Sequence, residues 1–485
     1  MKAASTTPTG AEMNNLVIDM THGGVKIAVG LAKEGRNVLA YDIYNTLNIV
    51  DRKMLEVYDV WLLEDLSELE TYKGEMRIIH PVHLPLTREE ICKNNPDLKY
   101  SFATHHEIVA ELLQDWGGDI PKIEVTGVKG KTSCVFMLKE ILIDENPLIL
   151  SSLGAMLYEE GKEIILKKDI SITPANIKET VDLAYKIANP VCKIADGVVE
   201  SENLRKYESA IFESSLGACG IGDVGLLTNI SEDYPIADNH SRASEAKKQI
   251  FNCPTVVCNK ESLDLYYSDV NHPKINTFSI TDDSANLYAG DVSYSLDKSE
   301  ISVNYRDVKT VSGKILNGSL TVKTFAPGRY HVSNTFGVIL TCLALEIDED
   351  KIIEGLANFN GITGRTEKRS NGERIVIEEI NPGINTDAIR QSVEMIDNLG
   401  DWYVAIGGDY GITCEEIDED KVADYLESLE SEIILTGEVG SSIADKLTDK
   451  TYSIKDISEI YDFALKNDKN LLMIYRSDYS KVSQR

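Results

Sequence analysis

The residues most able to do chemistry form one short run: Thr126, Gly127, Val128, Lys129, Gly130, Lys131, Thr132 and Ser133. Glycines let a backbone approach phosphate oxygens closely, and the N–H groups that open a helix attract anions. The ammonium of Lys131 can lie against the β- and γ-phosphates, and the hydroxyl of Thr132 is a ligand for Mg²⁺. The run therefore predicts a phosphate-binding loop that holds ATP.

This run is shorter than the standard P-loop pattern, because Val125 stands where that pattern has its first glycine. A chance turn is the alternative interpretation. Residues 123–125 read Ile-Glu-Val and predict a strand, and residues 134–143 predict a helix. A strand, a glycine-rich turn and a helix in this order favour phosphate binding.

Three successive α/β patterns make up the chain, whose 485 residues are too many for one ordinary core. Residues 14–115 alternate strands and helices and predict a Rossmann-like domain. Residues 116–363 predict a larger central ATP-binding domain, and residues 364–485 predict a smaller α/β domain. Residues 1–13 lack the apolar core of a signal peptide and are expected to form a disordered extension.

Finer patterns appear within each of these parts. The turn Thr21-His22-Gly23-Gly24 lacks the Gly-x-Gly-x-x-Gly fingerprint, so we do not expect a dinucleotide there. Alternation of apolar and polar residues between 275 and 325 predicts antiparallel strands added to a parallel sheet. Four strands are expected in the last part, at 375–380, 402–411, 432–437 and 471–477.

The charge balance narrows the range of partners. A net charge of -30, from 49 basic and 79 acidic residues, repels nucleic acid and anionic membranes, so neither is expected to bind. No apolar run approaches the roughly 18 residues that cross a bilayer. The eight cysteines contain no CxxC pair, which favours reduced thiols. We expect a soluble, cytoplasmic monomer or homodimer.

Several separated segments, from about residue 115 onward, resemble motifs of the Mur ligase family. The loop resembles the family's TGxNGKT sequence, with Lys129 in place of Asn. Phe212-Glu213-Ser214-Ser215 resembles its ESS element, which implies that Glu213 ligates magnesium. Lys247 aligns with a lysine that is carbamoylated in many members, and a carbamate is a metal-binding anion. An exposed helical lysine is the alternative.

A second metal contact in the family comes from a histidine in an NxTxDH element, which residues 229–234 resemble. Tyr234 stands in the place of that histidine. His240, six residues further on, is the candidate to take over the role, and a surface histidine is the alternative.

Two further resemblances concern the nucleotide. Residues 327–334 are similar to the element that holds adenine, with Asn334 matched and His331 where the first Asn would be. Gly364-Arg365-Thr366-Glu367 resembles the GRxE element at the junction of the last two domains, which implies that Arg365 reaches the phosphates. Residues 378–382 partly resemble a DYAHNP element, and a turn role for Asn381-Pro382 is the alternative to a catalytic one.

The resemblance implies a three-domain α/β architecture with a Rossmann-like N-terminal domain, a central P-loop ATPase domain and a C-terminal α/β domain. It also implies ATP and two Mg²⁺ ions as cofactors. A carboxylate attacks the γ-phosphate to give an acyl phosphate, and a nucleophile then displaces phosphate. Lys131, Lys247 and Arg365 are the expected catalytic residues.

The segments IDMTHGGVKIA and SITPAN are similar to one archaeal branch of the family, the coenzyme F430 synthetases of methanogens. That likeness implies a nickel seco-tetrapyrrole substrate, whose propionate is activated and whose nickel arrives with it. The residues expected to hold this substrate lie in two segments: Thr21, His22, Gly23, Gly24, Thr173 and Asn176. Purely structural roles for His22, His105 and His106 stay open.

Three other functions also stay open. The first is an amide-forming Mur-type ligase that adds an amino acid to a carboxylate. The second is a P-loop small-molecule kinase, in which the phosphate stays on the product. The third is a nucleotide-binding regulator without chemistry.

Overall fold

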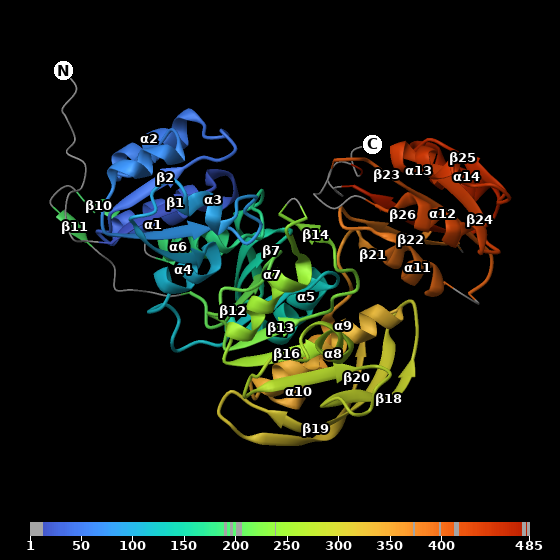
Figure 1. Ribbon diagram of the computed structural model, residues 1–485. Coiled ribbons are helices and arrows are strands. Elements are labelled where there is room, and N and C mark those ends of the chain that lie inside the picture. The colour runs from blue at the N-terminus through green and yellow to red at the C-terminus, as the bar shows by residue number, and fades with distance from the viewer. Residues whose placement is uncertain are drawn as a thin grey trace.

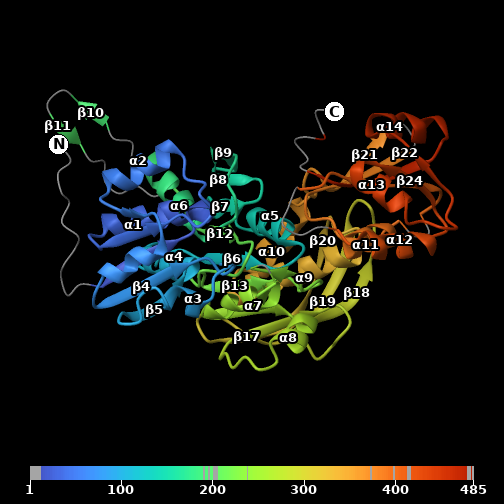
Figure 2. The same ribbon diagram turned by 45° about the horizontal axis from the view of Figure 1, so that its top comes forward.

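The computed structural model describes residues 13–188, 192–194, 197–199, 206–237, 239–371, 374–396, 399–411, 417–477 and 482. Three β-sheets of five, eleven and six strands follow one another along the chain. The second sheet lies between the other two (Figure 1; Figure 2). The predicted α/β class with three parts is confirmed. Residues 1–12 of the expected extension lie outside the described residues.

The first sheet is parallel throughout, in the order β3-β2-β1-β4-β5. Its middle strand has Leu16, Val17 and Ile18 fully buried, because helices cover both faces. Val17 packs with α1 and α4 on one face, and Leu16 and Ile18 pack with η2 and α3 on the other. The elements are β1 (Asn14–Ile18), η1 (Met20–Gly24), α1 (Val25–Lys33), β2 (Val38–Tyr41), α2 (Ile49–Val57), β3 (Trp61–Leu63), η2 (Leu66–Thr71), β4 (Glu75–His80), α3 (Arg88–Cys92), β5 (Lys99–Thr104) and α4 (His105–Leu112).

The central sheet is mixed, in the order β20-β19-β18-β17-β16-β13-β6-β12-β7-β8-β9. Strands β18 to β7 in that order are parallel, and antiparallel strands extend the sheet at both edges. The strands are β6 (Lys122–Thr126), β7 (Leu148–Ser151), β8 (Gly154–Glu159), β9 (Lys162–Lys167), β12 (Ala210–Glu213), β13 (Val224–Leu227), β16 (Thr255–Asn259), β17 (Ile275–Ser279), β18 (Leu287–Ser293), β19 (Ser299–Lys309) and β20 (Ile315–Thr324). The antiparallel strands predicted between 275 and 325 are confirmed, whereas the β8–β9 hairpin was not predicted.

The helices of the central part cover the sheet and join it to its neighbours. They are α5 (Lys131–Ile141), η3 (Ile143–Glu145), α6 (Pro174–Ala188), α7 (Ala243–Lys247), η4 (Lys248–Asn252), α8 (Lys260–Tyr266), α9 (Arg329–Ala344) and α10 (Glu349–Asn358). Two short antiparallel ribbons accompany them, β10 (Cys192–Ile194) with β11 (Gly197–Val199) and β14 (Pro235–Ile236) with β15 (Ser241–Arg242). None of the described helices is both long and apolar enough to cross a membrane.

The third sheet has the order β21-β22-β26-β23-β24-β25, with one antiparallel edge strand, β21. The four strands predicted for this part are confirmed as β22, β23, β24 and β26. The elements are β21 (Arg365–Asn371), β22 (Arg374–Ile380), α11 (Thr386–Glu394), β23 (Trp402–Gly408), α12 (Glu419–Glu427), β24 (Glu432–Thr436), α13 (Gly437–Ala444), β25 (Tyr452–Ile454), α14 (Ile457–Lys466) and β26 (Asn470–Arg476).

The first and central parts share one hydrophobic core. Ile27 and Ile108 of the first part pack in the same cluster as Ile177 and Phe212 of the central part, with α6 between them. The third part has its own core around Ile389, Val404 and Leu435. Continuous apolar packing therefore joins the first two parts. The third part, which has its own core, begins at β21, the strand that follows Gly364.

Two histidines at the start of α4 are buried in this shared region. The Nε2 of His105 donates to the Ile18 carbonyl over 3.1 Å. Burial lowers the pKa of His105 and that of His106 to about 3. Both imidazoles are therefore neutral in the folded protein near neutral pH.

We expect the free energy of unfolding to decrease as the pH falls below 6.5, the usual pKa of histidine. An unfolded imidazole binds a proton near that pH, whereas the folded ones stay neutral down to about 3. The stabilisation is complete above pH 6.5 and is lost by about 1.4 kcal/mol per pH unit for each histidine between these values. Urea unfolding in mildly acidic buffers measures the slope. In the double variant His105→Gln/His106→Gln, the slope of the free energy of unfolding against pH should decrease by the equivalent of about two protons. An unchanged slope would show that these two histidines do not cause the pH dependence.

Candidate active site

The loop predicted to hold phosphate connects β6 to α5. The Nζ of Lys131 donates to the carbonyls of Gly127 and Val128, at 3.0 and 3.3 Å, so the side chain lies back over the loop. The N-cap residue of α5 is Gly130, which has no side chain to cap the first turn. The N–H groups at that helix end are therefore available to an anion.

The segment after β13 holds the middle of this loop in place. The hydroxyl of Thr228 and the Nδ2 of Asn229 donate to the Lys129 carbonyl, at 2.6 and 3.1 Å. The Oδ1 of Asn229 accepts from the Lys129 N–H at 3.2 Å. These contacts fix the backbone of Lys129, so its side chain is directed outward to the cleft that α9 and α11 line.

Glu213, at the end of β12, lies against the start of α5. Its Oε1 accepts from the Thr132 hydroxyl at 3.1 Å, and its Oε2 accepts from the Ser152 N–H at 3.0 Å. The hydroxyls of Thr132 and Ser152 are 3.0 Å apart. A buried carboxylate beside two hydroxyls is a set of hard oxygen donors, which suits Mg²⁺. Ser152 was not predicted, although it directly follows the buried strand β7.

Lys247 is fully buried, in contrast to the exposed alternative considered for it. Its Nζ donates to the Ser215 carbonyl at 2.7 Å and lies 5.7 Å from the centre of the Tyr234 ring. Ser215 is two residues beyond Glu213, so the structure brings Lys247 to the same segment. His240 lines a separate cavity of about 240 Å³ together with His80 and other residues of the first part.

Asn334 and His331 lie on the first turns of α9. A Cβ atom at Gly130, whose φ is +82°, would be 2.1 Å from the Asn334 Oδ1, so this amide lies directly on the loop. The Nδ1 of His331 accepts from the Gly328 N–H at 3.2 Å, and its Nε2 is 3.0 Å from the Thr366 hydroxyl. Burial lowers the pKa of His331 to about 3. Both ring nitrogens of this neutral histidine are thus engaged within the protein.

The junction between the central and third parts carries Arg365 and Thr366. The Nη2 of Arg365 donates to the Ser152 hydroxyl at 3.3 Å, so the guanidinium reaches the Thr132 and Glu213 group. The Thr366 hydroxyl donates to Glu379, and the Nδ2 of Asn381 donates to the same carboxylate at 2.6 Å. Burial raises the pKa of Glu379. The sequence indicated Glu379 and Asn381 only through a partial motif, and Thr366 had no predicted contact.

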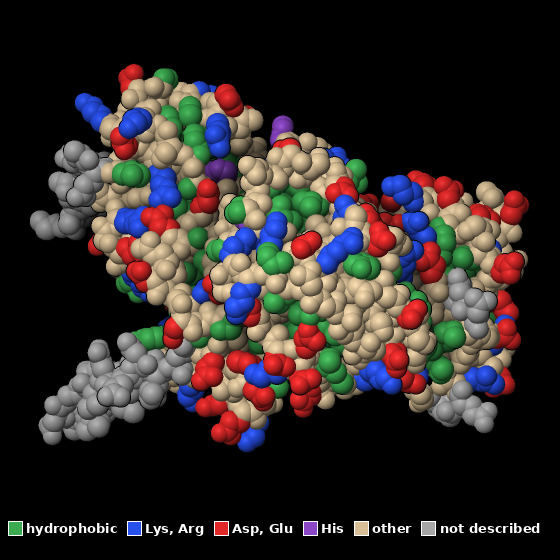
Figure 3. Space-filling model, turned by 90° about the horizontal axis from the view of Figure 1, so that it is seen from below, with side chains coloured by type: hydrophobic (Ala, Val, Ile, Leu, Met, Phe, Trp, Pro, Cys, Tyr) green, Lys and Arg blue, Asp and Glu red, His purple; other side chains and the backbone are tan. Residues whose placement is uncertain are grey.

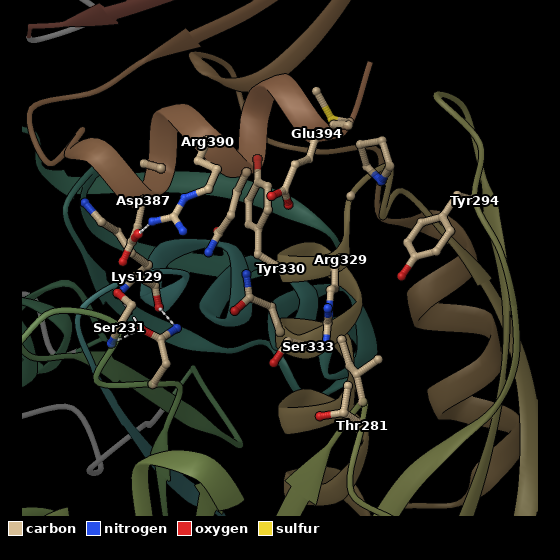
Figure 4. A pocket seen from close by; sticks show the side chains of 18 of the residues that line it. Lys129, Ser231, Thr281, Tyr294, Arg329, Tyr330, Ser333, Asp387, Arg390 and Glu394 are labelled. Carbon is tan, nitrogen blue, oxygen red and sulfur yellow. Dashed lines mark hydrogen bonds and ion pairs between the residues drawn. The ribbon is translucent and has the colours of Figure 1, made fainter. Parts of the chain in front are cut away.

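A cavity of about 880 Å³ opens beside the loop, between the central and third parts (Figure 4). Lys129, Ser231 and Thr281 lie on its central side together with the first turns of α9. On the side of the third part, the cavity is lined by α11, which contributes Asp387, Arg390 and Glu394 (Figure 4). This volume is within the range of sites that bind cofactors and nucleotides.

The predicted substrate residues come together between the first and central parts. A Cβ at Gly23 would be 2.5 Å from the Ala175 Cβ and 3.8 Å from the Thr173 Oγ1. Thr21, His22 and Gly24 share this turn, η1, with Gly23. Asn176 is buried, and its Nδ2 donates to the Ser171 carbonyl at 2.6 Å. The Ser215 N–H donates to the Ile172 carbonyl at 3.0 Å, which ties this mouth to the Glu213 segment.

Known proteins resemble the chain over most of its length. Residues 125–342 match the sequence profile of the Mur ligase middle domain, and residues 368–478 match that of the coenzyme F430 synthetase CfbE C-terminal domain. Coenzyme F430 synthetase of Methanocaldococcus jannaschii is 27% identical over 89% of this chain and 92% of its own. The enzyme of the same name from Methanosarcina acetivorans is 27% identical over 88% and 91%. MurF from Acinetobacter baumannii has a similar fold, with a TM-score of 0.54 and 15% identity over 87% and 91% of the two chains.

We expect Glu213→Gln to fold like the wild type and to lose about 100-fold or more in the Mg²⁺-dependent formation of ADP. The amide keeps the shape of the side chain but removes the negative charge that a cation needs. Steady-state release of ADP at several Mg²⁺ concentrations measures the loss. Glu300→Gln, in an exposed pair with Lys323 on the far antiparallel strands, is the matched control. Wild-type rates in Glu213→Gln would show that this carboxylate has no part in the site.

Proposed function

This chain belongs to the Mur ligase family of ATP-dependent ligases, and on that premise we propose that it closes a carbocyclic ring on a nickel seco-tetrapyrrole acid to give coenzyme F430. The observation that carries the proposal is the match of residues 368–478 to the C-terminal domain of coenzyme F430 synthetase. Similarity to two such synthetases over 88% and 89% of the chain supports it. The substrate carboxylate is then a propionate side chain.

In this proposal the loop and Arg365 hold the triphosphate of ATP. The Lys131 ammonium lies over the loop at the N-terminus of α5, and the Arg365 guanidinium contacts the Ser152 hydroxyl, which lies 3.0 Å from that of Thr132. The cavity beside Lys129 and Asn334 has room for the nucleoside. Cations in these positions neutralise the charge that develops on the transferred phosphoryl group.

Two Mg²⁺ ions would have different ligands. The Thr132 hydroxyl and the Glu213 carboxylate fit one ion, because both are hard oxygen donors within 3.1 Å of each other. Lys247, once carbamoylated, would offer anionic oxygens to the second. Bound Mg²⁺ would neutralise negative charge on the transferred phosphoryl group.

The chemistry then has two steps. A propionate oxygen attacks the γ-phosphorus of ATP, so that a carboxylate–phosphorus bond forms and ADP leaves. A nucleophilic carbon of the macrocycle next attacks the acyl carbon, a carbon–carbon bond forms, and phosphate leaves. The substrate acid loses one water overall. The first and third parts would exclude water from the site, so that the acyl phosphate is not hydrolysed.

The proposed substrate site is the mouth formed by η1 and the segment 171–176. Gly23 packs on Ala175 there, and Lys26 donates to Asn176. The mouth is joined through Ile172 and Ser215 to the segment that carries Glu213. A propionate can therefore point toward the phosphates while the macrocycle lies outside. The nickel belongs to the substrate and needs no resident metal motif.

We expect purified protein with ATP, Mg²⁺ and the nickel seco-tetrapyrrole acid to yield a product lighter by one water, together with ADP and phosphate. Mass spectrometry of the tetrapyrrole and a phosphate assay measure the two outcomes. Hydroxylamine added during turnover should trap the acyl phosphate as a hydroxamate. An unchanged tetrapyrrole mass would overturn the proposal.

The same assay distinguishes the other functions. An amide-forming ligase would release phosphate with an amino acid and a carboxylate, without any tetrapyrrole. A small-molecule kinase would leave the phosphate on its product, and no hydroxamate would form. A nucleotide-binding regulator would give no ADP with any substrate, and Lys131→Ala would change binding alone.

We expect activity to depend on bicarbonate if Lys247 is carbamoylated. In buffer freed of carbon dioxide the rate should fall by about tenfold and return when bicarbonate is added, because the carbamate is a reversible adduct of a neutral amine. Lys248→Gln, which changes the exposed neighbour, should keep this dependence. Lys247→Gln should lose most activity and gain nothing from bicarbonate. A wild type insensitive to bicarbonate would contradict the modification.

A further inference from the structure

We infer that the Nε2 of His22 accepts the proton that the nucleophilic carbon loses in the second step, with Asp19 and His83 as positioning residues. The inference rests on the proposed function and assigns its proton acceptor. His22 lies in η1, on the substrate side of the mouth. It was predicted only as a residue that contacts the substrate.

The carboxylate of Asp19 fixes the orientation of this imidazole. Its Oδ2 is 2.6 Å from the His22 Nδ1, and its Oδ1 accepts from the N–H groups of Thr21 and His22 at 2.9 and 3.1 Å. The Asp19 side chain is fully buried, so the carboxylate has one position. An Nδ1–H bonded to a carboxylate leaves the lone pair on Nε2, which is the arrangement of a general base.

The imidazole is accessible although its partner is not. The His22 side chain is 40% exposed, whereas that of Asp19 is 0% exposed. The hydrogen bond to Asp19 raises the pKa of His22. A base with a raised pKa and an open nitrogen can take a proton from a bound substrate near neutral pH.

The backbone around the pair adopts unusual φ and ψ angles, which cost free energy. Asp19 has a φ of +73°, in a region that residues other than glycine rarely adopt. The turn that follows has non-helical backbone angles at His22 and Gly23. Strained backbone of this kind is often found at functional sites, where the surrounding structure compensates for it.

Other titratable groups face the pair from three elements. The His83 ring, after β4, packs edge-on against His22 with centroids 4.6 Å apart, and its Nε2 is 3.8 Å from the Asp19 Oδ2. Burial lowers the pKa of His83, which keeps it neutral. Tyr44, after β2, packs on His22 with ring centroids 5.8 Å apart. His105 of α4 also lies near Asp19, and burial keeps its imidazole neutral. Among these groups, the carboxylate of Asp19 is the charged one that contacts His22.

The turn that carries the pair is linked through the segment 171–176 to the segment that carries Glu213. Gly23 touches Ala175, and the segment 171–176 is bonded to Ser215. A carbon of a substrate held at this mouth can therefore face His22 while its propionate faces the phosphates.

The proton balance of the step is as follows. The carbon–hydrogen bond breaks, and its electron pair forms the bond to the acyl carbon. The proton moves to the His22 Nε2. The acyl carbon–oxygen bond breaks, and phosphate leaves with the electron pair. His22 returns the proton to solvent before the next turnover.

The test separates the two steps in His22→Gln, with ring product and hydroxamate measured in the same samples. Ring closure should fall by about 10²–10⁴-fold. The ratio of trapped hydroxamate to ring product should rise by at least about 100-fold, because the acyl phosphate waits for a base. His272→Gln, which changes a histidine bonded to the Cys253 carbonyl, is the matched control. An equal fall of both products would give His22 a structural role and overturn the inference.

Two further readouts respond to a base and not to a structural role. The wild-type rate of ring closure should rise with pH as His22 loses its proton. Asp19→Asn should shift this rise to lower pH, because the variant lacks the carboxylate that raises the pKa of His22. In His22→Ala the rise with pH should disappear, and free imidazole should restore part of the rate. Failure of imidazole to restore it, with an unchanged pH profile, would contradict the inference.

Three outcomes distinguish this inference from a metal site and from failure of the proposed function. One equivalent of zinc retained by the wild type but not by His22→Ala would assign Asp19, His22 and His83 to a metal, and would overturn the proton role. A wild type that forms no ring product would overturn the proposed function itself. Ring closure by His22→Gln at the wild-type rate would overturn the inference alone.

Discussion

The site depends on one constraint, which is that the carboxyl ends of four adjacent parallel strands meet at a single edge. In the central sheet β13, β6, β12 and β7 are neighbours in that order. The loop predicted to hold phosphate follows β6, and Glu213 ends β12. Thr228 follows β13, and Ser152 follows β7. Residues 100 positions apart in the chain, such as Asn229 and Lys129, thus contact one another.

A second constraint joins this edge to the third part. The Thr366 hydroxyl meets Tyr330 and His331 from α9 and Glu379 from β22. Thr366 has a φ of +57°, which a β-branched residue adopts only when its surroundings hold it. The helix that carries Asn334 and the sheet that follows Arg365 are therefore linked through one side chain. A movement of the third part would therefore act directly on the cavity beside the loop.

Local positive charge accounts for anion binding by a chain of net charge -30. On the face seen in Figure 3, basic side chains lie singly or in small groups among acidic ones. Lys129 and Lys131 belong to the loop, and Arg365 reaches it from the junction. Helix N-terminal N–H groups add to this field without adding net charge.

The sequence was sufficient for the features that depend on local pattern. The three α/β parts and the strand–turn–helix context of the loop could be predicted from strand and helix periodicity, whereas Glu213 and Lys247 were indicated only by the resemblance to Mur ligases. Contacts made by single hydroxyls, such as those of Ser152 and Thr366, could not, because serine and threonine are common at strand ends and turns. The Asp19–His22 pair also escaped the sequence, since its geometry depends on a left-handed Asp19 that no residue pattern announces.

The central claim is that a carboxylate is activated by the γ-phosphate of ATP at this edge. The most direct measurement uses a substrate whose carboxylate carries ¹⁸O, followed by mass analysis of the released phosphate. The account predicts that one labelled oxygen passes to phosphate in each turnover, because the acyl carbon–oxygen bond breaks when phosphate leaves. Phosphate without label, formed in step with product, would contradict it.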